Sequence, residues 1–273
     1  MLATIQSYFE HIPSAHRAMI LAGGICFFWL VESAIPLFRF KYNKGKHAAI
    51  NIFFTLTTIL INFGFALMMV RTSDWTQQNH FGLLNWFHLS PVLAALFGLL
   101  CLDFIGAYLV HRIEHKVKFL WRFHMVHHAD THVDTTTANR HHPGESVIRA
   151  LFAIFAVLVL GTPMWMVMLY QSASVVLSQF NHANIRIPQW FDKTIGLIIV
   201  SPNMHRVHHH ITRPQTDSNY GNIFSFWDRL LGTYDATPMH QIQYGLDVLD
   251  NSKDESLAYQ LQVPFNQQIK TDE

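Results

Sequence analysis

Long apolar stretches alternate along this chain with short polar ones. Runs of about twenty apolar residues, the length that crosses a bilayer as a helix, occupy residues 18–38, 48–70 and 91–110. Two further apolar stretches fill residues 147–184 and are divided by Gly161-Thr162-Pro163. This division predicts either a tight helical hairpin or a re-entrant pair. The pattern therefore predicts an all-α polytopic membrane bundle with about four to five membrane-embedded helices.

The distribution of basic residues orients the bundle. Loop 39–47 and segment 111–149 are rich in lysine and arginine, whereas loop 71–90 carries only Arg71 as a fixed positive charge. Cytoplasmic loops hold the excess of such residues, and an odd number of spans separates each basic segment from loop 71–90. We therefore expect both basic segments in the cytoplasm and the N-terminus outside.

Composition narrows the class of protein. Half of the residues are apolar, only 14% are charged and the formal net charge is +1, so no basic surface indicates nucleic-acid binding. Cys26 and Cys101 lie inside apolar runs and are typical of buried thiols. No repeat or linker divides the chain, which predicts one integral-membrane domain over residues 1–273. The stretch 240–273 is rich in Gln and Asp, and we expect a loose C-terminal tail there.

Histidine is concentrated in the polar stretches. His111 and His115 are four residues apart, so on a helix they lie on one face. The pattern His-x-x-His-His also gathers three side chains on one helical face, and it occurs twice. Its copies are His124, His127 and His128, and His205, His208 and His209. Neutral imidazole is the commonest metal ligand, and eight of them suit two metal ions rather than one tetrahedral zinc. The ligand type leaves iron, copper, zinc and nickel open.

Asp103 lies inside an apolar span, where a carboxylate requires a partner. On a regular helix it shares a stripe with His111 and His115. We therefore expect Asp103 either to accept the outer ring N–H of a ligating histidine or to pair with Arg112 or Lys116. Such a site, at the cytoplasmic ends of the spans, is open sideways to lipid chains. Oxygen chemistry on unactivated C–H bonds would require a redox metal there.

At these residues the chain resembles the fatty acid hydroxylase/sterol desaturase superfamily of membrane di-iron oxygenases. Residues 103–115 look like its first histidine box, 120–128 like its second and 202–209 like its third. Residues 219–234, with Asn-Tyr-Gly and Trp-Asp-Arg-Leu-Leu-Gly-Thr-Tyr, are similar to its closing segment. The resemblance covers roughly residues 95–235, and the order of the boxes is specific.

The resemblance implies a helical membrane domain with a cytosolic, histidine-rich helical cap that holds two iron ions. It also implies O₂-dependent hydroxylation, desaturation or ether cleavage of a lipid such as a fatty acyl chain or a sterol. Carried over by position, the metal ligands are His111, His115, His124, His127, His128, His205, His208 and His209. His182 matches a further family histidine. The residues alone do not decide between His141 and His142 as a ligand, and the resemblance makes His142 the better candidate.

The chain shows no source of electrons. It contains no Gly-x-Gly-x-x-Gly loop and no clear haem or iron–sulfur motif, so an external reductase, ferredoxin or cytochrome is implied. Trp121, Trp227 and Tyr234 are either electron-transfer or lipid contacts, or interfacial aromatic anchors, and the second interpretation is favoured.

Two rival functions share these features: a zinc-dependent membrane hydrolase or isomerase, and a non-enzymatic metal carrier. A carrier should place polar ligands along the membrane interior, whereas here the histidines gather at one edge, so the oxygenase is favoured. Because no C-terminal retention signal is present, we expect the bacterial inner membrane rather than the endoplasmic reticulum.

Overall fold

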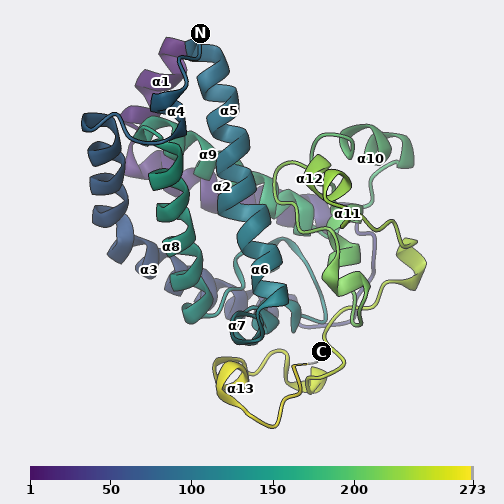
Figure 1. The fold of residues 1–273 in the computed structure, drawn as a ribbon. Coiled ribbons are helices and arrows are strands. Elements are labelled where there is room, and N and C mark those ends of the chain that lie inside the picture. The colour runs from purple at the N-terminus through teal and green to yellow at the C-terminus, as the bar shows by residue number, and fades with distance from the viewer. Residues whose placement is uncertain (272–273) are drawn as a thin grey trace.

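The computed structural model describes residues 1–271, which are mainly helical (Figure 1). Among these residues there is no β-strand, only isolated bridges that join Pro36 to Ile185 and Ile199 to Phe224. Within residues 1–271, four helical segments are long and apolar enough to cross a membrane: Ser14–Ala34, Lys44–Trp86, Pro91–Lys116 and Pro143–Leu160. The prediction of an all-α membrane bundle is confirmed.

Helix α3 (Lys44–Gln78), which packs against α8, has two unlike faces. Its outer face carries Phe63, which is 79% exposed, and Leu60, which is 69% exposed. Its buried residues include His47, Asn51 and Thr55, spaced four apart. This pattern is typical of a helix at the surface of a membrane bundle. Lipid covers the apolar side chains of its outer face, and other helices supply hydrogen-bond partners for the polar side chains of its inner face.

The third span is continuous and is made of α5 (Pro91–Asp103), the π-helical segment η1 (Phe104–Leu109) and α6 (Val110–Lys116). A uniform α-helix would put Asp103 on the stripe of His111 and His115. A π-helix bonds residue i to i+5 and turns by less than 100° per residue. The segment η1 therefore moves Asp103 off that stripe.

Helices α8 (Pro143–Leu160) and α9 (Met164–His182) meet at a tight turn. Gly161 caps α8 in the left-handed region with φ of 68°. A Cβ at this position would overlap the carbonyl oxygen of Phe81, so both the dihedral angle and the available space require glycine. The two helices form a hairpin. Helix α8 begins next to α7, and α9 ends next to α7 as well, so the chain returns to the end of the bundle at which α8 began.

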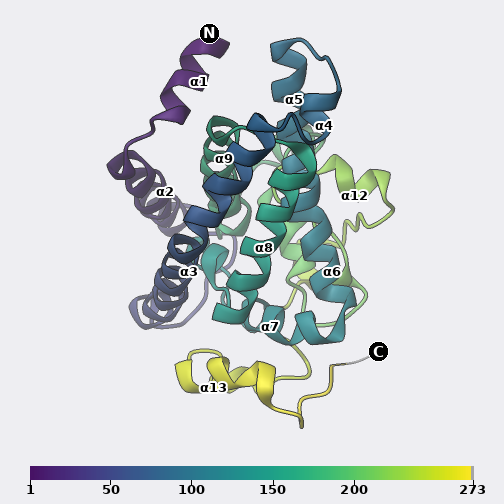
Figure 2. The ribbon, with the colours of Figure 1, turned by 60° about the vertical axis from the view of Figure 1, so that its left-hand side comes forward.

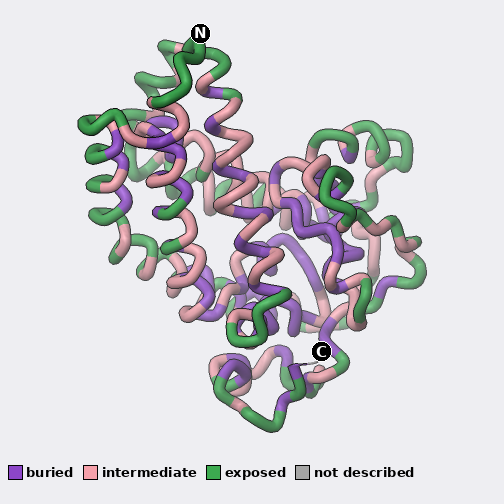
Figure 3. The backbone as a smooth tube through the Cα atoms, in the orientation of Figure 1, coloured by how far each residue is buried: buried purple, intermediate pink, exposed green. Residues whose placement is uncertain are grey.

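A cap lies below the bundle and along one side of it (Figures 1 and 2). It contains α7 (Lys118–His128), α11 (Pro202–His208), α12 (Phe226–Leu230) and α13 (Leu257–Gln262). Figure 3 shows that buried parts of the chain are concentrated where the cap meets the bundle.

The stretch after residue 240 differs from the expected loose tail. Leu246, Leu249 and Val263 are buried in one core with Trp121 and Met125 of α7. Figure 2 shows α13 lying beneath α7. The few apolar residues scattered among Gln and Asp are sufficient to hold this stretch against the cap, since each buried aliphatic side chain contributes about 1.5–3 kcal/mol.

Candidate metal centre

Nine histidines gather where the cap meets the bundle. Two lie on α6, three on α7, one at the end of α9, and three on α11 and the residue after it. They are His111, His115, His124, His127, His128, His182, His205, His208 and His209, and all are buried. The start of α11 is set locally, because Pro202 is its first residue and the Ser201 side chain accepts the backbone N–H of Met204.

The ring nitrogens fall into two groups, in each of which the candidate ligand atoms all lie within 4.8 Å of one another. The first group is His111, His115, His124, His128 and His208, and the second is His127, His182, His205 and His209. Each His-x-x-His-His motif is divided, since its first and last histidines join one group and its middle histidine joins the other. Around the helix axis, the last histidine of the motif lies about 40° from the first, and the middle histidine lies about 60° from the first in the opposite direction. The middle side chain therefore points toward a different site.

Rings within each group face one another through their Nε2 atoms. Nε2 of His111 lies 3.0 Å from Nε2 of His124. In the second group, Nε2 of His182 lies 3.0 Å from that of His205 and 3.2 Å from that of His127. Two unprotonated nitrogens at this separation repel unless a cation lies between them. Nitrogens bound at right angles, about 2.1 Å from a shared ion, stand about 3.0 Å apart, so the donor set fits one metal ion in each group.

The outer Nδ1 atoms of five of these rings meet acceptors. The pairs are His111 with Tyr220 O (2.9 Å), His115 with the Asp217 carboxylate (3.2 Å), His124 with the Glu145 carboxylate (2.7 Å), His182 with Ser178 O (2.7 Å) and His208 with Ser218 O (2.7 Å). A carbonyl or carboxylate oxygen cannot donate, so each Nδ1 carries the proton and each Nε2 carries the lone pair. None of the five acceptors was found from the sequence: three are backbone carbonyls, which have no signature there, and the carboxylates of Asp217 and Glu145 meet the histidines only through the fold.

Burial keeps the rings of the cap neutral. It lowers the pKa of His124 to about 3, although the Glu145 carboxylate raises it. Burial also places the pKa of His128 and of His208 well below the usual value, and the neighbouring rings lower both further. Neutral imidazole is the form that binds metal, so these side chains are ready as ligands near neutral pH.

Glu145 on α8 lies behind the first group. Its Oε1 accepts from Nδ1 of His124 and from Nδ1 of His141, each at 2.7 Å, and from Nε of Arg149 at 2.9 Å. Arg149 also pairs with the buried carboxylate of Glu114. Glu145 therefore holds one candidate ligand and, through His141, reaches a partly exposed imidazole at the edge of the centre.

His142 lies outside both groups. It caps α8, where its Nδ1 accepts the backbone N–H of Gly144, and its Nε2 lies 3.3 Å from the carbonyl oxygen of Leu261. His141 is the member of the pair that lies near the centre, stacked on His127 with ring centroids 5.0 Å apart. The structure therefore places His141, and not His142, near the candidate metal centre. His142 is engaged elsewhere because α8 begins at Pro143 and a free backbone N–H of its first turn donates to the His142 side chain.

Asp103 does not contact a histidine, contrary to one expectation, nor does it pair with Arg112 or Lys116. It accepts the backbone N–H groups of Ile223 and Phe224, each at 3.2 Å, and the indole N–H of Trp227 at 3.1 Å. The π-helical turn that follows Asp103 directs it to the closing segment of the cap. Asp103 therefore fastens that segment to the bundle, and Trp227 is engaged there as a hydrogen-bond donor.

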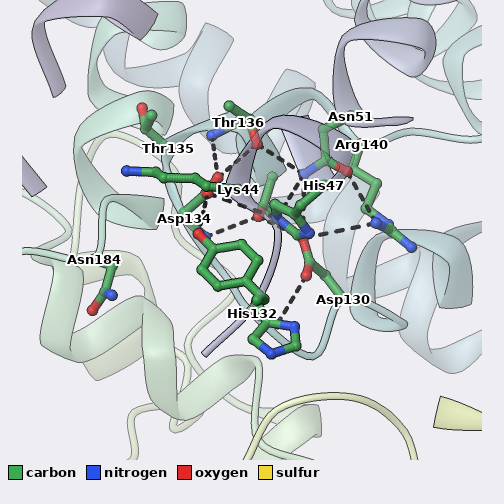
Figure 4. A network of polar contacts seen from close by, with 12 residues as sticks. Lys44, His47, Asn51, Asp130, His132, Asp134, Thr135, Thr136, Arg140 and Asn184 are labelled. Atoms are coloured by element: carbon green, nitrogen blue, oxygen red, sulfur yellow. Dashed lines mark hydrogen bonds and ion pairs between the residues drawn. The ribbon is translucent and has the colours of Figure 1, made fainter. Parts of the chain in front are cut away.

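A second polar network fixes the corner that follows α7 (Figure 4). The fully buried Arg140 donates to the carbonyl oxygen of Val126 and to the side chain of Asn51, both at 3.0 Å. Asp130 accepts from the Asn51 amide and lies 3.4 Å from Nε2 of His47. The network ties the histidine-bearing end of α7 to α3, so the positions of its imidazoles depend on polar residues well outside the two groups.

Comparison with known proteins identifies the family of the chain. A family model described as fatty acid hydroxylase matches residues 95–233, the part that contains all nine clustered histidines. No solved structure matches the chain.

Three relatives illustrate the similarity. The ornithine lipid hydroxylase OlsE of Rhizobium tropici is 25% identical over 65% of this chain and 51% of its own length. The alkylglycerol monooxygenase of Danio rerio is 29% identical over 75% of this chain and 45% of its own length. A cholesterol 25-hydroxylase-like protein of Danio rerio is 33% identical over 45% of this chain and 48% of its own length. The chain thus spans about half the length of these relatives. It belongs to the fatty acid hydroxylase family.

Proposed function

We propose that this protein is a membrane oxygenase that holds two iron ions and inserts one oxygen atom of O₂ into a lipid. The observation that carries the proposal is the paired donor set, two groups of buried imidazoles whose Nε2 atoms converge at 3.0–3.2 Å. Two adjacent sites of this kind are expected of an enzyme that uses two metal ions. A single zinc site or a transport path would not require them.

Hydroxylation is favoured over desaturation. The relatives are named a lipid hydroxylase, a monooxygenase and a hydroxylase-like protein, and all three names describe oxygen insertion. The balanced reaction is RH + O₂ + 2 e⁻ + 2 H⁺ → ROH + H₂O. Insertion next to an ether oxygen gives a hemiacetal that falls apart, so ether cleavage is the same step on a different lipid.

Bound iron would supply the redox chemistry with O₂. The chain's own residues would hold the ions through nine neutral imidazoles, five of whose ring orientations are fixed by outer acceptors. Burial of all nine rings keeps water away from the reacting C–H bond.

The substrate would come sideways from the bilayer, because the centre lies where the apolar helices end. The electrons would come from an external reductase, ferredoxin or cytochrome. The basic character of loop 39–47 and segment 111–149 supports a cytoplasmic centre, in a bacterial inner membrane.

The test is metal analysis together with labelled oxygen. Protein purified in detergent is expected to contain two iron ions per chain without a haem absorption band. With dithionite as reductant and ¹⁸O₂, one label is expected in the product of a panel of fatty acids, sterols, ornithine lipids and alkylglycerols. Tightly held zinc that iron does not replace, with turnover in the absence of O₂, would instead establish the hydrolytic alternative.

Glu145→Gln is expected to weaken metal binding in the first group about tenfold to a hundredfold. The amide keeps the shape of the side chain but removes the charge that holds the Nδ1–H of His124. The measurement is metal retained per chain during titration with a chelator. Glu255→Gln, which breaks a surface pair with Lys46, is the matched control and should behave as wild type. Retention of both ions at the wild-type chelator concentration would contradict the role of Glu145.

A further inference from the structure

A shallow basic pocket opens beside the first histidine group, at the corner between α6 and α7. Its volume is about 200 Å³. Its walls include His115, Lys116, Lys118, Trp121, Arg213 and Asp217. Three fixed cations and one carboxylate make the pocket positive. It is smaller than the roughly 300 Å³ at which sites for organic ligands begin, so it fits a single carboxylate or phosphate group better than a flavin or a nicotinamide.

The rim of the pocket is accessible and is connected to the metal centre. Lys116 and Lys118 are exposed. Lys116 pairs at 2.8 Å with the carboxylate of Asp217, which also holds Nδ1 of His115 at 3.2 Å. Arg213 lies 3.4 Å from the same carboxylate. A continuous chain of polar contacts therefore runs from the surface to a candidate ligand.

Trp121 forms the inner wall of the pocket. Only 4% of it is exposed, so it is not the interfacial anchor that the sequence favoured. Its ring centroid lies 4.6 Å from that of His115 and 5.4 Å from that of His128, two rings of the first group. The guanidinium of Arg213 lies 5.8 Å from the same indole. The indole is thus in ring contact with the metal centre on one side and with the basic pocket on the other.

We propose that this pocket is the docking site of an acidic one-electron carrier protein, with Trp121 as the contact through which electrons reach the first histidine group. A carboxylate of the carrier would sit between Lys116 and Lys118. In each transfer the reduced carrier loses one electron and the metal centre gains it, and no bond forms or breaks. Two successive carriers deliver the two electrons that the reaction consumes. This inference rests on the proposed function, which requires electrons from outside the chain.

The position of the corner favours a protein partner over the bilayer. The span that ends at Lys116 has 26 residues. At about 1.5 Å per residue such a helix is about 39 Å long, against about 30 Å for the hydrocarbon core. The helix is thus longer than the hydrocarbon core is thick, which leaves length for its end at Lys116 to extend beyond the hydrocarbon, where a carrier can reach it. Small, charged and readily reversible interfaces are typical of electron-transfer partners.

The first test measures binding with metal-loaded protein in nanodiscs of uncharged lipid. The probe is a plant-type [2Fe–2S] ferredoxin, an acidic carrier, and cytochrome c, a basic carrier, is the negative probe. Lys116→Glu/Lys118→Glu is expected to raise the Kd for ferredoxin at least about tenfold at low ionic strength, with most of the difference lost at high salt. Lys193→Glu/Lys253→Glu, with the same change in net charge at two other exposed lysines, should leave the Kd unchanged.

Three outcomes would overturn the docking site: no ferredoxin binding, equal Kd values for both double variants, or equal binding of both carriers. Capture by phosphatidylserine vesicles that is lost in Lys116→Glu/Lys118→Glu, with the ferredoxin Kd unchanged, would reassign the surface to the membrane. Because Lys116 pairs with Asp217, metal content is measured throughout. If the metal content of the double variant falls, the ferredoxin Kd of Lys118→Glu alone decides whether the pocket is the docking site, since Lys118 makes no hydrogen bond to the metal centre in the described structure.

The second test concerns Trp121. Trp121→Leu is expected to slow single-turnover oxidation of bound ferredoxin at least about tenfold, measured at saturating ferredoxin and on protein with the same metal content as wild type. Trp190→Leu, on the 70% exposed tryptophan of α10, is the control and should keep the wild-type rate. An unchanged rate in Trp121→Leu would exclude the indole as the contact. Dithionite-driven turnover of the wild type tests the proposed function separately, so its absence alone would leave the binding result interpretable.

Discussion

His208→Ala is expected to remove the metal of the first group while the second group keeps its own, and His127→Ala is expected to do the reverse. The reason is that the two residues occupy equivalent middle positions of the His-x-x-His-His motifs but belong to opposite groups. Metal content should fall from two ions per chain to about one in each variant. Lipid oxidation should fall more than about a hundredfold, beyond the effect expected from removing an outer partner.

The control for this experiment is His88→Ala, which removes an exposed histidine far along the chain from both motifs. It should keep two ions and full turnover. If all three variants lost metal equally, the ions would be adventitiously bound by a histidine-rich surface. If both His208→Ala and His127→Ala retained two ions, the two-group arrangement would not describe the metal centre.

Arg140→Met is expected to destabilise the folded protein by about 3–5 kcal/mol, the cost of removing one partner of a buried charge network. Arg140 is fully buried and lies 3.9 Å from the carboxylate of Asp130, and its guanidinium joins α7, α3 and the C-terminal stretch. The variant would leave that carboxylate without its cation. The measurement is the shift of the denaturation midpoint in detergent, with the slope checked for constancy.

Arg186→Met provides the comparison, because Arg186 is exposed and surface substitutions usually change stability by less than about 0.5 kcal/mol. Arg140→Lys should fall between the two, since it keeps the charge but its single ammonium nitrogen cannot reach all three acceptors that the guanidinium spans. A loss in Arg140→Met no larger than in Arg186→Met would show that the corner after α7 does not depend on this network.

The sequence alone determined where the chain enters apolar surroundings and which side chains could hold metal. The spans follow from runs of apolar residues, and the hairpin follows from Gly161 and Pro163, because these are local properties of consecutive residues. The histidine boxes were equally visible, since spacing of three and four residues places side chains together on any helix.

Only the tertiary structure decided how those histidines divide into two groups and what lies behind them. The division depends on how α7 and α11 face each other, and the outer acceptors at Tyr220, Ser178 and Ser218 are backbone carbonyls with no residue signature. The role of Asp103 changed because a π-helical turn altered the rotation that a regular helix implies. The sequence predicted exposure for Trp121 and a loose tail after residue 240, and both predictions were wrong. The two segments bury each other, and such burial depends on contacts between distant parts of the chain, which neither segment shows by itself.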